Sequence, residues 1–443
     1  MSAYCANAMG QLKTFGFKSG DRVAICAPTI PEYIIVVLSL WRMGVVVCPI
    51  NPRLPVQSMS AYLSQIHAVL FLTSVQIKAL HPGISVRTLI LNEIVNFDAR
   101  HGFNYEIGPW EPNNDQEVTV IATSGSSGLP KPVVHTWGNH YFNALGSQDV
   151  VPVEPSARWL LCLPLFHVSG IAILVRVMIA KAAIVLPVED ELSETLLKRQ
   201  VTHVSLVATQ MSRMLSTTRG IDALKAVKFI LLGGSAIPAS LIDTTMDLGL
   251  NVLTSYGLTE MSSQVATSLA GCCTRVLKYR ELKVGEKGQI LVRGPVLFKG
   301  YIQSGRINLP LSEDGWFDTG DLGAIDEKGC LTVLGRRDNM FISGGENIHP
   351  EEIEKVLLSM KGIVGAMVVP REDSEFGFRP VAFIEQDKEM GPRVDEIVRF
   401  AQDHLPSFKI PVTFFPWPHD MIEKSLKVSR QDLQEFIKMR RNY

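Results

Sequence analysis

The chain has 443 residues, of which 46% are hydrophobic and 20% are charged, a composition typical of folded globular proteins rather than disordered or fibrous ones. Its 43 basic and 44 acidic residues nearly cancel, so no excess positive charge is present to hold nucleic acid, and we expect no such partner. The length predicts two or three structural units.

Cysteine usage and hydropathy indicate a cytoplasmic protein. The seven cysteines are odd in number, scattered and without the short paired spacings of a zinc site, which favours a reducing compartment. The two longest apolar stretches, 33–50 and 170–188, are interrupted by Arg42 and by Arg176 and Lys181. We therefore expect no transmembrane segment, and the first residues lack the pattern of a secretion signal.

Short β-branched runs alternate with helical periodicity through the first 250 residues, which predicts an α/β fold. Helices are expected at 32–43 and 58–67 and strands at 22–26, 45–48, 118–122, 159–162, 203–207, 229–232 and 251–253. This order favours mostly parallel sheets covered by helices.

The chain changes character after about Gly315, where Gly- and Asp-rich turns separate short strands such as 331–334. We place a domain boundary near Gly335, giving a large N-terminal domain at 1–335 and a small, mobile α+β domain at 336–443. Pro350 with acidic residues behind it predicts a helix start in this second domain.

The segment TSGSSGLPK, Thr123 to Lys131, follows an apolar strand and combines hydroxyls, two glycines and a lysine, which suits a loop around a phosphate chain. It is not a Walker A loop, because Pro130 stands where that pattern needs glycine, and this disfavours an ordinary P-loop kinase or ATPase. Taken alone, a solvated Ser/Gly turn is the competing interpretation.

Two further motifs place polar groups near strand ends. SYGLTE, from Ser255, supplies Tyr256 to stack on adenine and Glu260 as a hard oxygen for Mg²⁺, at the strand end where α/β sheets bind ligands. WFDTGD, from Trp316, supplies Asp321 to accept ribose hydroxyls. A core aromatic, a surface charge and a turn-capping aspartate are the alternatives.

These three motifs and GRRDNMFISGGENIHPEEIE, from Gly335, occur in the order found in acyl-CoA synthetases of the adenylate-forming superfamily, which the whole chain resembles. The resemblance implies ATP, Mg²⁺, coenzyme A and a small carboxylic acid as ligands, and a C-terminal domain that rotates between two half-reactions. It leaves the oligomeric state open.

The resemblance also implies roles for individual residues. Asp321 and Arg336 would contact the ribose, Glu260 would bind Mg²⁺ and act with Thr259 in catalysis, and Asp338 would be the hinge. Gly344 and Gly345 would line the pantetheine tunnel. The ATP phosphates would lie against Thr123, Ser124, Gly125, Ser126, Ser127, Gly128 and Lys131, and the adenine against Gly233, Gly234, Ser235, Ala236, Tyr256, Gly257, Leu258 and Thr259.

Lys427, in SLKVSRQDL, matches the C-terminal lysine that serves adenylation in this superfamily. Its charge would neutralise the negative charge that develops as the carboxylate attacks the α-phosphorus and pyrophosphate leaves. Most relatives carry glycine before this lysine, whereas this chain has Leu426. A further basic residue on a C-terminal helix is the alternative.

Segments from Leu163, Thr202 and Ile230 resemble the o-succinylbenzoate–CoA ligase branch of menaquinone synthesis. That acid has a second carboxylate, which needs a cation in the pocket. The resemblance points to Arg213 for this carboxylate and to His167 at the junction of acid and adenylate, with Gly257 in the same pocket. A surface arginine and a structural histidine are the alternatives.

Other functions remain open at this point. The chain could activate a fatty or aryl acid, load a carrier protein, or bind nucleotide without turnover. Relatives also carry a few dozen further residues before the start of this chain, so we expect an incomplete N-terminal subdomain that affects stability more than chemistry.

Overall fold

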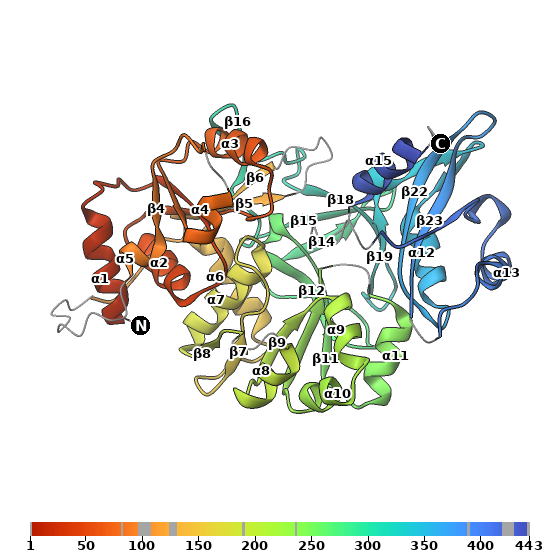
Figure 1. The fold of residues 1–443 in the computed structure, drawn as a ribbon, viewed down its shortest axis with the longest axis horizontal. Coiled ribbons are helices and arrows are strands. Elements are labelled where there is room, and N and C mark those ends of the chain that lie inside the picture. The colour runs from red at the N-terminus through yellow and green to blue at the C-terminus, as the bar shows by residue number, and fades with distance from the viewer. Residues whose placement is uncertain are drawn as a thin grey trace.

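The computed structural model describes residues 2–80, 83–95, 108–123, 131–187, 191–234, 237–387, 390–418 and 429–440. Within these residues the chain forms four β-sheets with helices packed against them (Figure 1). The first two sheets contain the parallel strands that the sequence predicts, and the other two are almost entirely antiparallel.

The first sheet has a parallel half and an antiparallel half. Strands β5, β2, β1, β3 and β4 run parallel, and β6, β16 and β17 continue the sheet antiparallel. In spatial order its strands are β17 (Arg306–Asn308), β16 (Gly300–Gln303), β6 (Lys131–Thr136), β5 (Glu117–Thr123), β2 (Val46–Pro49), β1 (Arg22–Cys26), β3 (Leu70–Thr73) and β4 (Thr88–Ile90).

In the second sheet, strands β8, β7, β9, β10 and β11 run parallel. Strands β12 and β13 continue the sheet antiparallel. Its spatial order is β13 (Arg275–Val276), β12 (Ser263–Leu269), β11 (Val252–Leu258), β10 (Phe229–Gly233), β9 (His203–Leu206), β7 (Arg158–Leu160) and β8 (Ala183–Val185).

Two antiparallel sheets follow along the chain. The third sheet contains β14 (Glu281–Val284), β15 (Gln289–Arg293), β18 (Phe317–Ile325) and β19 (Leu331–Arg336). The fourth contains β21 (Glu346–Ile348), β20 (Phe341–Ser343), β23 (Gly377–Gln386), β22 (Ile363–Asp373) and β24 (Phe414–Pro416), the last of which pairs parallel to β23.

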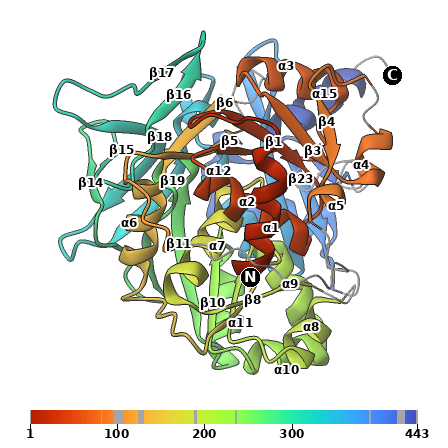
Figure 2. The same cartoon turned by 90° about the vertical axis from the view of Figure 1, so that its left-hand side faces the viewer.

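Helices fill the space between the first two sheets and cover their outer faces. In Figure 2, α2 (Pro31–Arg42) and α7 (Val168–Ala180) lie between β1 and β5 on one side and β8 and β10 on the other. One buried apolar cluster joins these helices to both sheets. The remaining helices of the N-terminal part are α1 (Ser2–Lys13), α3 (Val56–Gln65), α4 (Val75–Leu80), α5 (Leu91–Ile94), α6 (Trp137–Ser147), α8 (Leu192–Lys198), α9 (Ala208–Leu215), α10 (Thr218–Lys225) and α11 (Ala239–Asp247).

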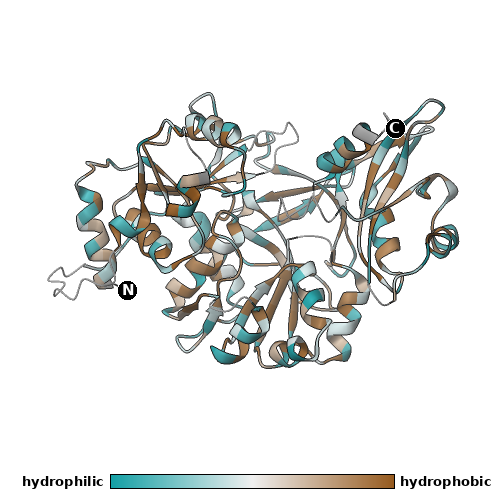
Figure 3. Cartoon of the chain, in the orientation of Figure 1, coloured by the Kyte–Doolittle hydropathy of each residue, from teal (hydrophilic) through white to brown (hydrophobic). Residues whose placement is uncertain are grey.

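The C-terminal sheet packs helices on both faces. The helices α12 (Pro350–Leu358) and α13 (Val394–His404) share one apolar cluster with it, and α15 (Arg430–Arg440) lies in another. Figure 3 shows mostly brown, hydrophobic strands with teal on the peripheral helices, as burial of the strands requires. No helix in the described ranges is long and apolar enough to cross a membrane.

The predicted α/β fold class is confirmed, and the two ends of α2 show how the sequence determines one element. Pro31 occupies its first turn, where a missing N–H costs nothing. Gly44, which follows the helix, has φ of 75°, and a Cβ there would lie 2.9 Å from Ser19 Oγ. Only glycine meets both conditions without strain.

Strand pairing changes sheets between Arg336 and Phe341, close to the expected domain boundary. The boundary itself, with domains at 1–335 and 336–443, stays a prediction. The structure adds two features that the sequence did not predict, namely the antiparallel third sheet and the extension of β11 through Leu258, so that most of SYGLTE lies within a strand.

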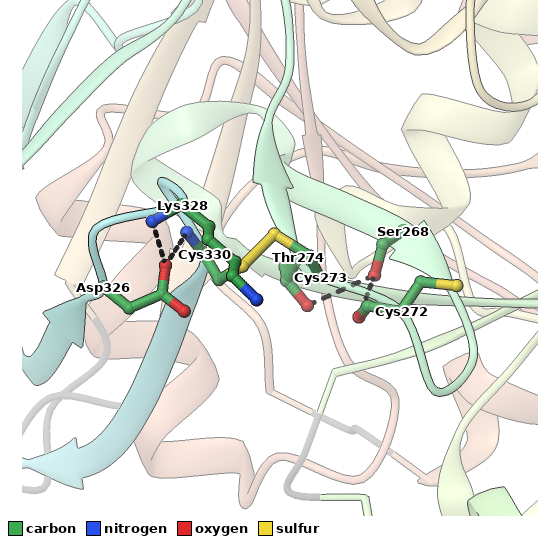
Figure 4. Close-up of a disulfide and its surroundings, with 7 residues drawn as sticks. All are labelled: Ser268, Cys272, Cys273, Thr274, Asp326, Lys328 and Cys330. Atoms are coloured by element: carbon green, nitrogen blue, oxygen red, sulfur yellow. Dashed lines mark hydrogen bonds between the residues drawn. A yellow bond between two sulfur atoms is a disulfide. The ribbon is translucent and has the colours of Figure 1, made fainter.

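The structure also pairs two of the seven cysteines, whose scattered positions we took to favour a reducing compartment. Cys273, after β12, and Cys330, before β19, form a disulfide with 5.1 Å between their Cα atoms (Figure 4). Beside it, the N–H of Leu331 donates to the carbonyl of Thr274 at 2.9 Å. The bond therefore ties the third sheet to the edge of the second, while Cys272 stays exposed and unpaired.

Candidate active site

The two ends of the predicted phosphate loop lie side by side. Thr123 is the last residue of β5 and Lys131 the first of β6, and these residues pair in the antiparallel ladder. The Thr123 hydroxyl donates to the carbonyl of Lys131 at 3.4 Å. The five loop residues between them that we assigned to the ATP phosphates lie outside the described residues, as does Pro130; they are Ser124, Gly125, Ser126, Ser127 and Gly128.

Glycines in the second sheet allow a close approach of backbone. Gly257 is needed because a Cβ there would lie 1.9 Å from the carbonyl oxygen of Ser263 on β12. Gly234, with φ of 83°, follows Gly233 at the end of β10, where Gly233 pairs with Ser255. Ser235 and Ala236 lie outside the described residues.

Three predicted nucleotide-binding residues form one hydrogen-bonded group. The Tyr256 hydroxyl donates to Oδ2 of Asp321 at 2.6 Å, and Nη1 of Arg336 donates to Oδ1 of the same carboxylate at 3.0 Å. Asp321 and Arg336 are partners in the β18/β19 ladder, which accounts for their contact. Burial raises the pKa of Tyr256, so its hydroxyl stays protonated.

Both oxygens of Asp321 therefore already have protein partners, and the residue is only 8% exposed. Each oxygen retains a second lone pair with which it can accept a ribose hydroxyl. Arg336 also donates to Asp338, the predicted hinge residue, at 3.3 Å. This group links the second sheet, the third sheet and the start of the C-terminal part.

Glu260 and Thr259 follow β11 in a short 3-10 turn. Three residues from other parts of the chain donate hydrogen bonds to this turn. The hydroxyl of Tyr301, on β16, donates to Oε1 of Glu260 at 2.7 Å. The N–H of Phe298 donates to the Glu260 carbonyl at 2.8 Å. Nε2 of His135, on β6, donates to the Thr259 carbonyl at 2.7 Å, so the strand that begins at Lys131 also supports this turn.

The donor set at Glu260 fits a magnesium ion that is bound together with a nucleotide. Glu260 is half-buried, and its Oε2 has no hydrogen-bond or ion-pair partner among the described residues. In those same ranges no group of three or more His, Cys, Asp or Glu side chains could hold a metal. One carboxylate oxygen matches the way Mg²⁺ takes few protein ligands and fills its shell with phosphate and water.

The remaining predicted site residues lie in a β-turn, at the start of a helix and outside the described residues. Gly344 and Gly345 form the β20/β21 turn with φ of 57° and 90°, and a Cβ on Gly344 would meet the ring of Phe376. His167 is exposed at the start of α7 and lies beside Phe166, with 4.6 Å between ring centroids. Lys427 lies outside the described residues.

Arg213, predicted to bind the second carboxylate, is exposed on α9. No contact of its side chain joins it to another predicted site residue in the described part of the chain. Its role stays a prediction.

A different arginine is buried against β12, the strand that pairs with the one carrying Tyr256. Arg176, on α7, is 4% exposed and donates from Nη2 to Oε1 of Gln264 at 2.5 Å and to Oδ1 of Asn143 at 3.3 Å. Its Nε has no hydrogen-bond partner among the described residues. Gln264 lies opposite Gly257 in the β11/β12 ladder, which places Arg176 one layer from the predicted pocket.

Arg280 is a second buried cation near the first. It is 6% exposed, and its guanidinium donates to the carbonyls of Gln264, Lys278 and Asn143. Burial lowers the pKa of Arg176 to about 10, and burial together with the charge of Arg176 lowers that of Arg280 to about 9. Neither guanidinium has a carboxylate partner within the described ranges, so a buried positive charge remains that an anionic ligand would balance.

Comparison with protein-family models shows which family has this fold and these motifs. The model described as AMP-binding enzyme matches residues 2–302. The chain belongs to the AMP-binding enzyme family. The match covers the second sheet, the first sheet except Gln303 and β17, and the residues from Thr123 to Tyr301 described above.

Individual relatives and solved structures show which AMP-binding enzymes this chain is similar to. The 2-succinylbenzoate–CoA ligase of Bacillus licheniformis is 33% identical over 91% of this chain and 87% of its own length. The structure of o-succinylbenzoate CoA synthetase (MenE) from Bacillus subtilis in complex with the acyl-adenylate intermediate OSB-AMP matches with a TM-score of 0.83 at 29% identity, covering 98% of this chain and 91% of that one. The same enzyme in complex with ATP and magnesium ion matches with a TM-score of 0.81 at 30% identity, over 94% and 89%.

Sequence reasoning on this AMP-binding enzyme missed Tyr301, His135 and Arg176. Arg176 did leave a signal, because it is a charge inside an otherwise apolar helix, but we used it only to exclude a membrane span. Tyr301 and His135 lie in strands whose neighbours become visible only once β16 and β6 are placed beside the turn at Glu260.

Proposed function

We propose that this AMP-binding enzyme is a 2-succinylbenzoate–CoA ligase. One carboxylate oxygen of the acid attacks the α-phosphorus of ATP, the bond to pyrophosphate breaks, and an acyl adenylate forms. The thiol of coenzyme A, after losing its proton, then attacks the acyl carbon, and AMP leaves. The curated relative and the solved complexes named above support this proposal.

The buried charge of Arg176 is the observation that favours 2-succinylbenzoate over other acids. A fatty or simple aryl acid has one carboxylate, which is consumed in the adenylate, and would leave this guanidinium without a counter-charge in a dry environment. The second carboxylate of 2-succinylbenzoate can accept from Nε of Arg176, which has no hydrogen-bond partner in the part of the chain that the structure describes. This assignment replaces Arg213, which is exposed, as our preferred partner of that carboxylate.

The other residues take roles that follow from their contacts. Asp321 and Arg336 would hold the ribose, and Tyr256 would present its ring to the adenine while its hydroxyl steadies Asp321. Glu260, through Oε2, would bind Mg²⁺, which when present neutralises phosphate charge. Thr123 and Lys131 would fix the two ends of the loop around the leaving pyrophosphate.

Release of pyrophosphate with a panel of acids tests the proposal. We expect 2-succinylbenzoate to stimulate release far more than acetate, a fatty acid or cinnamate, and coenzyme A to convert the product to a thioester. Equal stimulation by an acid without a second carboxylate would contradict the substrate, and nucleotide binding without acid-dependent release would favour an inactive homologue.

Lys427 is the residue we propose for the first half-reaction. Lys427→Ala should abolish adenylate formation, because the lysine charge then no longer balances the charge developing at the α-phosphorus, and should leave the reaction of supplied adenylate with coenzyme A largely intact. Single-turnover assays of the two half-reactions measure this directly. Equal loss of both would contradict the role.

A further inference from the structure

Tyr301 joins two parts of the candidate active site that lie far apart in the sequence. It lies on β16 and pairs with Val133 of β6, the strand that begins at Lys131. Its ring packs edge-on against Phe298, with centroids 4.7 Å apart, and the Lys131 ammonium lies 6.0 Å from the ring centroid. The ring is therefore held by packing, which fixes where its hydroxyl points.

That hydroxyl donates to Oε1 of Glu260 at 2.7 Å, a short bond to a charged acceptor. The backbone of the Glu260 turn is already fixed, since the carbonyls of Thr259 and Glu260 accept from His135 and Phe298. The freedom that remains is rotation of the Glu260 side chain. Tyr301 removes it and leaves Oε2 as the carboxylate oxygen without a partner in the described part of the chain.

We propose that Tyr301 is a positioning residue for magnesium: its hydroxyl orients the Glu260 carboxylate so that Oε2 faces the metal of bound Mg²⁺–ATP. The inference rests on the proposed function for the role of Glu260, but not for the identity of the acid. Partners that orient a metal ligand in this way commonly change metal affinity by about 10- to 100-fold when they are removed.

The variant Tyr301→Phe isolates the hydroxyl, because phenylalanine keeps the ring against Phe298 and Lys131. Calorimetric titration of the full-length protein with ATP, without acid or coenzyme A, is carried out at a series of Mg²⁺ concentrations and in EDTA. We expect the Mg²⁺ concentration that half-saturates the gain in ATP affinity to rise about 10-fold. ATP affinity in EDTA should stay unchanged, and the melting temperature of the free protein should fall by no more than the loss of one hydrogen bond explains.

Two other tyrosine variants serve as controls. Tyr279→Phe removes an exposed hydroxyl that takes no part in this group, and should change neither quantity. Tyr256→Phe removes the donor to Asp321, and should weaken ATP binding by the same factor with and without Mg²⁺. The contrast between Tyr256→Phe and Tyr301→Phe separates ribose binding from metal positioning.

An unchanged Mg²⁺ dependence in Tyr301→Phe, or a loss of ATP affinity that is equal in EDTA and in Mg²⁺, would overturn the proposal. So would ATP binding by the unaltered protein that does not respond to Mg²⁺. Because no acid is present, a shifted Mg²⁺ dependence supports the role of Tyr301 even if 2-succinylbenzoate proves to be the wrong substrate.

Discussion

The side chain of Arg176 is buried, whereas that of Arg213 is exposed to solvent. A buried guanidinium that lacks a carboxylate partner gains much from a carboxylate ligand, whereas an exposed one is already solvated by water and gains little. Arg176→Met should therefore raise the KM for 2-succinylbenzoate by roughly 30-fold or more, which corresponds to about 2 kcal/mol or more for a buried charged hydrogen bond. The KM for ATP should change little.

Steady-state kinetics on both substrates checks this expectation. Arg213→Met is the matched control and should keep the wild-type KM for the acid. Arg176→Lys keeps the charge but loses the planar fork, so it should recover only part of the affinity. A large effect of Arg213→Met with none in Arg176→Met would restore the sequence-based assignment.

Two buried histidines, His135 and His140, are expected to make the stability of the fold depend on pH. His135 donates from Nε2 to a carbonyl, so its Nδ1 accepts from Thr119, whose oxygen accepts in turn from Nε2 of His140. Burial lowers the pKa of His135 to about 4 and that of His140 well below 6.5. Both rings are therefore neutral near pH 7.

The unfolded chain binds protons on these rings below about pH 6.5, while the folded chain does not. Their contribution to stability is therefore complete above pH 6.5 and is lost as the pH falls toward 4, by about 1.4 kcal/mol per pH unit for each ring. Urea unfolding at pH 5.5 to 8 should show this slope. His140→Gln, which keeps a donor but cannot titrate, should have a shallower one, and an identical slope would contradict the assignment.

At the scale of elements, residues with strong local signals were predicted well. The strand Arg22–Cys26 is apolar and buried from its second residue on and has the bounds expected from the sequence, and the helix predicted at Pro350 is observed as α12. The continuation of β11 through Gly257 was missed, because glycine is unfavourable in strands and its reason here is contact with β12. Because β12 follows only after the turn at Thr259–Met261, the sequence around Gly257 does not indicate this contact.

The helices α12 and α15 are joined by an ion pair that the sequence did not predict. Arg430 donates from Nη2 to both oxygens of Glu354, at 2.6 and 2.7 Å, and the N–H of Val368 donates to the same carboxylate. Glu354 is 7% exposed, and burial raises its pKa to about 7. Arg430 comes three residues after Lys427, so the pair fixes the chain close to that lysine in sequence.

Removing one partner of this pair should be costly. Arg430→Met leaves a buried carboxylate without a cation and should destabilise the C-terminal sheet by about 3–5 kcal/mol. The pKa of Glu354 is about 7 in the unaltered protein, and removal of the Arg430 charge raises it further, so the loss should grow as the pH rises above about 7. Hydrogen exchange of β22 amides at pH 6 and 8 measures it, and the double variant Glu354→Gln with Arg430→Met should recover most of the loss.

At the scale of the whole molecule, the candidate site forms where three sheets meet. The motifs in the sequence correctly indicated an AMP-binding enzyme, and each motif marks one contributor to the site. Their relative placement depends on long-range pairings, such as Asp321 with Arg336 and Tyr301 with Val133, that no single segment encodes. For this reason residues inside motifs could be predicted as site residues from the sequence, whereas residues that contact them from other strands, such as Tyr301, could not.

The disulfide between Cys273 and Cys330 makes one of these long-range connections covalent. It closes a segment with a sequence separation of 57 residues between the second and third sheets (Figure 4), and a closure of that length is worth about 4 kcal/mol in the chain-entropy model. Without reductant, thiol counting on the unfolded chain should find five free cysteines of seven. A reductant should lower the urea midpoint.

The double variant Cys273→Ser with Cys330→Ser should have the lower midpoint with or without reductant. It should still fold, because the hydrogen bond from Leu331 to Thr274 and the β18/β19 ladder remain. Cys272→Ser is the matched control, since that cysteine is exposed and unpaired, and it should keep both the higher midpoint and its sensitivity to reductant. Seven free thiols in the oxidised protein, or a midpoint that ignores reductant, would show that the two sheets are held together by non-covalent contacts alone.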